Sequence, residues 1–150
     1  MRVRRRMVLA AGLALLALMG LPGYLRAAAS WPKKAFESTA ASEALVSLYG
    51  TDRTSPSNRV QLSAPLIAEN GAVVPLSIQT TLEDVRSMSI VVEKNPRPLA
   101  ATFEILEGTI PAIDCRIKMA ESSRVMAVVQ TPAGLFSSFR EVTVTAGGCA

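Results

Sequence analysis

The sequence predicts an all-β protein: an immunoglobulin-like antiparallel β-sandwich, preceded by a helix and followed by a flexible C-terminal Gly-Gly-Cys arm. Three observations support this. From residue 59 onward the chain consists of short runs of strand length, apolar and polar residues alternate within several of them, and turn-forming residues separate them. The predicted strands are residues 59–63, 73–80, 87–93, 99–105, 113–119, 124–130 and 136–145.

The alternation is clearest in the run 113–119. Ile113, Cys115 and Ile117 are apolar, whereas Asp114 and Arg116 between them are charged. Successive side chains of a strand point to opposite faces of the sheet, so one face of this strand should meet the core. We therefore expect Cys115 to be buried, where a free cysteine behaves as a small hydrophobic residue.

Turn residues mark the ends of the runs. Asparagine, glycine and proline favour tight turns because they tolerate or impose the backbone angles that turns require. The predicted turns contain Glu69-Asn70-Gly71, Asn95-Pro96-Arg97-Pro98, Glu107-Gly108 and Pro132-Ala133-Gly134. Their spacing indicates one sandwich over residues 59–145.

Residues 30–58 are predicted to form a helix and a linker. Phe36, Ala40, Ala44 and Leu48 recur every four residues within 32–49, which is typical of an amphipathic helix, and Gly50 should end it. The polar stretch 51–58 then predicts a linker.

Residues 1–29 have the features of a signal peptide. Four arginines precede the apolar run 7–21, and three alanines at 27–29 offer a cleavage site. Arg5-Arg6 followed by apolar residues favours the twin-arginine route, which carries folded proteins, and an ordinary secretory signal is the alternative. Either signal predicts a periplasmic protein with no membrane span after cleavage.

The composition argues against several function classes. The signal segment holds five of the 16 basic residues, so the mature chain keeps 11 against 12 acidic ones and has no basic cluster for nucleic acid. The chain contains no histidine, which removes Ser-His-Asp and Cys-His catalysis, histidine metal sites and c-type haem attachment. We therefore expect a non-enzymatic protein without cofactor or metal.

Residues 146–150 are predicted to form a mobile arm. Gly147 and Gly148 have no side chain to restrict the backbone, and they place the thiol of Cys149 on a slim tether. Such a thiol suits a covalent carrier that visits the active sites of other proteins. The alternative is a structural or adhesion module of the periplasm in which Cys149 forms a disulfide with Cys115.

Four stretches of the chain, in order, give it a specific resemblance. They are residues 68–75 (Ala-Glu-Asn-Gly-Ala-Val-Val-Pro), 91–99 (Val-Val-Glu-Lys-Asn-Pro-Arg-Pro-Leu), 116–120 (Arg-Ile-Lys-Met-Ala) and 147–149 (Gly-Gly-Cys). With these, the chain resembles the SoxY family, the carrier subunits of the periplasmic thiosulfate-oxidising (Sox) system.

The resemblance implies a heterodimer with a second β-sandwich subunit, SoxZ, and a sulfur intermediate attached covalently to Cys149. It also implies three transient partners: a c-type cytochrome complex that joins thiosulfate to the thiol, a hydrolase that releases sulfate, and a sulfane dehydrogenase. The family tail usually has two glycines after the cysteine, whereas here Ala150 follows Cys149.

Overall fold

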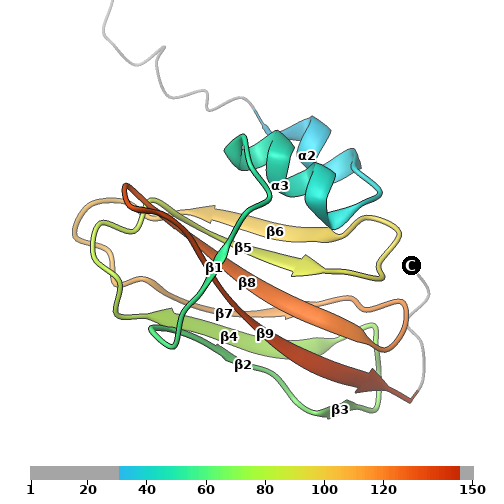
Figure 1. Cartoon of the computed structure of the whole chain (residues 1–150). Helices are drawn as coiled ribbons and strands as arrows, with labels where there is room; N and C mark the ends of the chain where they lie inside the picture. Colours follow the sequence, from blue (N-terminus) through green and yellow to red (C-terminus); the bar gives the residue numbers. More distant parts are fainter. Residues whose placement is uncertain (1–30, 146–150) are drawn as a thin grey trace, which may run out of the picture. The chain divides into compact units, whose positions relative to one another are not determined.

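The computed structural model describes residues 31–145 and is shown in Figure 1. The chain separates into two units, Met1–Trp31 and Pro32–Ala150. The predicted signal segment 1–29 and the predicted arm 146–150 lie outside the described residues. Across residues 31–145, no helix combines the length and the apolar character needed to span a bilayer.

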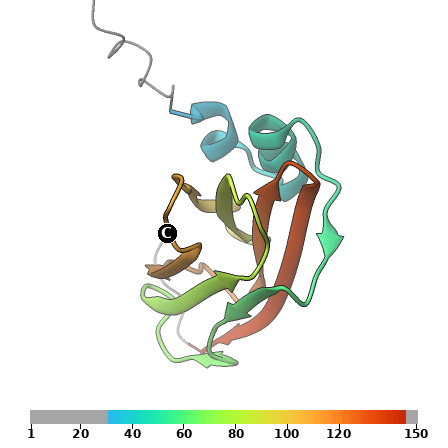
Figure 2. The same ribbon diagram turned by 90° about the vertical axis from the view of Figure 1, so that its left-hand side faces the viewer.

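The seven predicted strands are all present, with ends that differ by at most about two residues, as expected for boundaries read from sequence. They are β2 (Val60–Ser63), β4 (Val74–Thr80), β5 (Ser87–Val92), β6 (Leu99–Glu104), β7 (Ala112–Ile117), β8 (Ser123–Thr131) and β9 (Gly134–Val144). In the larger sheet the order is β9-β8-β5-β6, and in the smaller sheet it is β2-β4-β7. Figure 2 shows the two sheets from the side, facing each other.

The strand order is that of an immunoglobulin-type sandwich. The first, second and fifth of the long strands form the smaller sheet, and the chain crosses between sheets after β4, β6 and β7. Neighbouring long strands are antiparallel throughout. The predicted fold class, an antiparallel β-sandwich with an N-terminal helical segment, is confirmed.

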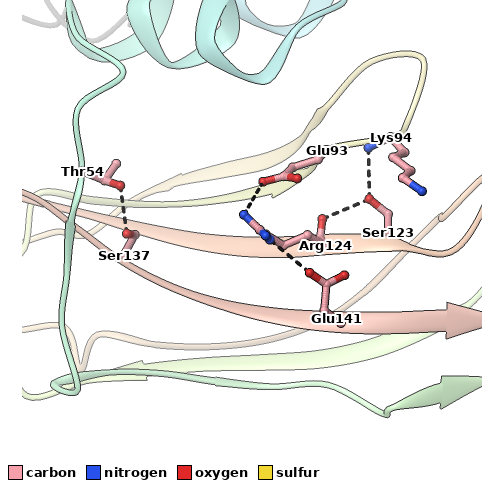
Figure 3. Close-up of polar contacts among 7 residues, drawn as sticks. All are labelled: Thr54, Glu93, Lys94, Ser123, Arg124, Ser137 and Glu141. Carbon is pink, nitrogen blue, oxygen red and sulfur yellow. Dashed lines mark hydrogen bonds and ion pairs between the residues drawn. The ribbon is translucent and has the colours of Figure 1, made fainter.

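Two short strands that the sequence did not predict cover the outer edge of β9. β1 (Ser55–Pro56) runs parallel to β9 near its start, and β3 (Ile67–Ala68) runs parallel to it near its end. The hydroxyl of Ser137 donates a hydrogen bond of 2.9 Å to Thr54 beside β1 (Figure 3). An uncovered edge strand invites pairing with other chains, so these segments close one side of the larger sheet.

The main core lies between the sheets. It is built from aliphatic side chains and methionine because the chain has few aromatic residues. Strand β5 is buried along its whole length, which identifies it as the centre of the larger sheet. The fully enclosed core side chains include Val74, Ile78, Met88, Ile90, Val92, Met119, Val125, Ala127 and Val129.

The prediction of a single helix over 32–49 is wrong in one respect, because the segment forms two helices. These are α2 (Lys33–Glu37) and α3 (Ala41–Tyr49), separated by extended backbone at Ser38 and Ala40. The Ser38 hydroxyl donates to the Lys34 carbonyl at 2.9 Å, a local bond by which serine competes with helix continuation. The predicted stop at Gly50 is confirmed, since this residue adopts the left-handed conformation with φ of 77°.

The two helices cover the outer face of the larger sheet (Figure 1). Ala35, Ala44 and Leu45 are buried against an apolar patch on β5, β6, β8 and β9. At the end of α3 the Tyr49 hydroxyl lies 2.5 Å from the hydroxyl of Ser89, which is fully buried in β5. This packing fixes the helical segment to the sandwich and gives the larger sheet a second, smaller core.

Candidate functional site at the arm end of the sandwich

The end of β9 defines the site that would carry the predicted arm. We call Val144 and Thr145 the arm root, since Thr145 is the last described residue. Three connections lie at the same end of the sandwich, namely residues 69–73 between β3 and β4, 93–98 between β5 and β6, and 118–122 between β7 and β8. We call this the arm end, and it is the end toward which the β9 arrow points in Figure 1.

The arm root is held by hydrogen bonds on both sides. On one side the backbone N–H of Val144 donates to the Ser122 hydroxyl at 2.9 Å. On the other side the N–H of Thr145 donates to the carbonyl of Ala68 at 3.1 Å, and its hydroxyl donates to the carbonyl of Glu69 at 3.3 Å. The position from which residues 146–150 start is therefore fixed relative to the sandwich.

The three connections are also tied to one another. The Asn95 side-chain amide donates to the Lys118 carbonyl at 2.8 Å and accepts from the N–H of Ala120 at 2.9 Å. The N–H of Met119 donates to the carbonyl of Gly71 at 2.7 Å. These bonds satisfy backbone groups that a turn would otherwise leave to solvent, and they make the arm end a single bonded unit.

This arrangement brings together the stretches that carry the family resemblance. Residues 68–75, 91–99 and 116–120 meet at the arm end, although they are far apart in sequence. The fourth stretch, 147–149, lies outside the described residues. The sequence predicts Asn95 as a turn residue and indicates no role for Ser122. The hydrogen bonds of both residues join segments that are distant in sequence. The one sequence feature that pointed to Asn95 is its place directly before Pro96 in a turn.

The predicted site residues Cys149, Gly147 and Gly148 also lie outside the described residues. The structure does place Thr145, the residue after which this segment begins. Cys149 is the fourth residue after Thr145, and an extended chain of four residue steps reaches about 13–14 Å. The thiol would therefore work within about that distance of the arm root.

Arg124 is engaged within the protein and is not a free anion site. Its guanidinium contacts Glu141 at 3.1 Å and Glu93 at 3.5 Å, as Figure 3 shows, and lies 4.8 Å from the centre of the Phe139 ring. Arg124, Glu93 and Glu141 are all exposed, so the two ion pairs contribute little to the free energy of unfolding. Arg124 is thus an exposed strand residue whose charge is paired on the surface.

The charged residues of the three connections balance one another. They are Glu69, Glu93, Lys94, Arg97, Lys118 and Glu121, all exposed. With equal numbers of acids and bases, these connections provide no field of one sign to attract an anion or an acidic partner.

Cys115 is only half-buried, which corrects the expectation of a buried side chain. Its side chain faces the core from β7, opposite Leu76 of β4, and it carries a free thiol. The exposure arises because β7 is the edge strand of the smaller sheet, and within residues 31–145 no strand pairs with its outer side. Burial, and secondarily the carboxylate of Asp114, raises the pKa of the Cys115 thiol above its ordinary value.

The comparison with protein families identifies this chain. The model of the sulfur oxidation protein SoxY matches residues 45–149, a range that includes the whole arm end and stops at Cys149. Among solved structures, the sulfur carrier protein SoxY from Chlorobium limicola f thiosulfatophilum is 34% identical, with a TM-score of 0.63. That match covers 69% of this chain and 94% of the other.

Two other solved structures that match are much less similar. A chain from a structure of T-cell activation by toxic shock syndrome toxin-1 is 14% identical, with a TM-score of 0.38, and the match covers 57% of this chain and 98% of that one. A lytic polysaccharide monooxygenase from Jonesia denitrificans is 12% identical, with a TM-score of 0.37, and the match covers 72% and 73%. No curated protein sequence matches significantly. On the family match, this chain belongs to the SoxY family of sulfur oxidation proteins.

Proposed function

We propose that this protein is a covalent carrier of sulfur intermediates in thiosulfate oxidation, with Cys149 as the attachment site. Membership of the SoxY family is the observation that carries the proposal, together with the similarity to a structure described as a sulfur carrier protein. The geometry is consistent with this role, because hydrogen bonds hold Val144 and Thr145, the residues from which the predicted arm starts.

Loading is an oxidation that joins the sulfur atom of Cys149 to a sulfur atom of thiosulfate. The Cys149 thiolate and the terminal sulfur of thiosulfate form an S–S bond and give a cysteine S-thiosulfonate, and two electrons leave to a c-type cytochrome complex. The carrier supplies the thiol and its position, and the visiting complex supplies the oxidant. A hydrolase then adds water across the bond to the terminal sulfonate, which releases sulfate and two protons and leaves a persulfide on Cys149.

The sequence around Cys149 offers no group that would activate its thiol in the way a catalytic cysteine requires. The chain has no histidine, and no lysine or arginine lies between Glu141 and Cys149. An unperturbed cysteine has a pKa of about 8.5, so only a small fraction is thiolate at neutral pH. A thiol of this kind suits a carrier that is activated by the enzyme it visits, and we propose that the protein is not an enzyme and needs no cofactor.

The proposed setting is the periplasm. The basic and apolar segment 1–29 supports export, and Arg5-Arg6 supports the twin-arginine route. We propose a heterodimer with a SoxZ-like subunit, which a route for folded proteins could export together with this chain. The cytochrome complex, the hydrolase and the sulfane dehydrogenase would be transient partners.

Stoichiometry separates a carrier from a catalyst. With the loading cytochrome complex, thiosulfate and excess ferricytochrome c, but no hydrolase, each heterodimer should release two electrons and then stop, because one thiol accepts one thiosulfate. The measurement is the amplitude of cytochrome c reduction against the amount of heterodimer. Continued reduction with trace amounts of the chain would contradict the proposal.

A further inference from the structure

The smaller sheet has an open edge along a short stretch of β7. Within residues 31–145 no strand pairs with the outer side of β7. Backbone bonds close this stretch at both ends. The N–H of Ala112 donates to the carbonyl of Ile110 at 2.8 Å, and the carbonyl of Lys118 accepts from the Asn95 side-chain amide at 2.8 Å. An open strand edge can pair with another chain, and here it can do so only between Ala112 and Lys118.

The backbone groups of Asp114 and Arg116 face this open edge. The N–H of Thr80 donates to the carbonyl of Pro111 at 3.3 Å, which fixes the alternation of hydrogen bonds between β4 and β7. Only every second residue of an antiparallel strand bonds to a given neighbour, so Asp114 and Arg116 direct their N–H and C=O groups away from β4. Pro75 agrees with this assignment, because it lies opposite Arg116 and has no N–H to donate.

The side chains of the same two residues are exposed and carry opposite charges. Asp114 lies opposite Ser77 of β4 and Arg116 lies opposite Pro75, so both side chains are on one face of the sheet. None of the ion pairs within residues 31–145 includes either residue. The acid and the base flank Cys115, and they are therefore placed symmetrically about it.

This symmetry makes the open stretch complementary to a second copy of itself. Suppose that a copy of β7 lies antiparallel beside it, with Cys115 opposite Cys115. Asp114 then faces Arg116 of the copy, and Ile113 faces Ile117 of the copy on the core side. Opposite charges that face each other across strands stabilise the pairing, whereas like charges destabilise it.

The same charges disfavour other neighbours. Charged side chains on an edge strand usually prevent pairing, since a strand without matching charges does not compensate them. Residues 113–117 read Ile-Asp-Cys-Arg-Ile, and this order pairs with its own reverse. An unrelated chain would not need a pattern that is symmetric about its centre, so the symmetry favours a second copy as the occupant.

We infer that β7 is a self-association edge, at which two copies of this chain pair about a two-fold axis at Cys115. The outward N–H and C=O groups of Asp114 in one copy bond to those of Arg116 in the other, and the two smaller sheets become one continuous sheet. Such a contact uses the same patch on both copies and closes on itself. The inference goes beyond the proposed function and does not depend on it, and a SoxZ-like subunit would bind a different surface.

The first test measures the dissociation constant of the pair by sedimentation equilibrium over a concentration series. The sample is the full exported chain carrying Cys149→Ser, so that no disulfide at that position joins two copies. Adding Arg116→Asp makes acids face each other at both symmetric positions, and adding Asp114→Arg makes bases face each other. Each change should weaken the pair about tenfold or more. Gln61→Asp is the control, because it adds an acid at an exposed position on β2, the opposite edge of the same sheet, and should leave the constant unchanged.

Mixing the two charge variants tests the register itself. In the inferred register, the two bases of the Asp114→Arg chain face the two acids of the Arg116→Asp chain. An equimolar mixture should therefore form mixed pairs, although each variant alone is largely monomeric. The substituted side chains are exposed, so both variants should keep the melting temperature of the parent chain.

Cys115 supplies a distance readout on the same background. Facing residues of a pair without mutual hydrogen bonds have Cα atoms about 4.5 Å apart, within the range of about 4.4–6.8 Å that a disulfide spans. Oxidation by copper phenanthroline should therefore join two copies through Cys115, and Cys115→Ser should prevent this.

Three results would overturn the inference. They are a parent chain that stays monomeric over the whole series, charge variants that do not associate when mixed, and an equal loss of association with Gln61→Asp. The first two are also the results expected if this edge binds a different protein. None of these measurements uses thiosulfate, so a chain that cannot be loaded with thiosulfate would count against the proposed function alone.

Discussion

Replacing Cys149 by serine should abolish loading with thiosulfate while leaving the fold intact. A serine hydroxyl cannot form the S–S bond that holds the intermediate, and residues 146–150 follow the last strand of the sandwich. The measurement is thiosulfate-dependent reduction of cytochrome c by the reconstituted heterodimer and loading complex. The melting temperature should match that of the wild-type protein.

The control for this result is Cys115→Ser. Cys115 lies in β7 with its side chain toward the core, and its raised pKa keeps the thiol protonated at neutral pH, so this variant should still be loaded. Loading that survives Cys149→Ser and disappears with Cys115→Ser would show that the wrong cysteine has been assigned.

The largest expected effect on stability is that of Ile90→Ala. Ile90 is fully buried in β5 between the two sheets, and removing its three outer carbons leaves a cavity that the surrounding strands cannot fill. Substitutions of this kind lower the free energy of unfolding by about 2–5 kcal/mol. Small domains are stable by only about 5–15 kcal/mol, so this change should be visible as a large shift in urea denaturation.

Ile110→Ala is the matched control, since it makes the same chemical change at an 80% exposed position. Its expected effect is within about 0.5 kcal/mol, as for most surface substitutions. Similar effects at the two positions would mean that the core between the sheets has been placed incorrectly.

Much of the fold could be predicted because the sandwich leaves a local pattern in the sequence. Apolar and charged residues alternate in 113–119 because one face of this strand packs against the core, and the turn residues mark where strands end. Gly50 likewise predicts the end of a helix, and α3 ends there in the structure. These features depend on neighbouring residues, so they can be recognised without knowing what packs against them.

Other features depend on distant contacts and could not be predicted in the same way. β1 and β3 have two residues each and exist only because β9 lies beside them. The exposure of Cys115 follows from the place of β7 at a sheet edge, which the alternation does not reveal. Asn95 acts by bonding another connection, so its turn chemistry was predicted but its role at the arm end was not.

The most direct test of the carrier role is peptide mapping by mass spectrometry after incubation of the heterodimer with thiosulfate, the loading complex and oxidised cytochrome c. Trypsin cleaves after Arg116 and Arg140, which places Cys115 and Cys149 on separate peptides. We expect a reductant-sensitive thiosulfonate on the Cys149 peptide and an unmodified thiol at Cys115. A disulfide joining the two peptides, with no thiosulfate adduct on either, would contradict the carrier role and indicate a structural sandwich domain.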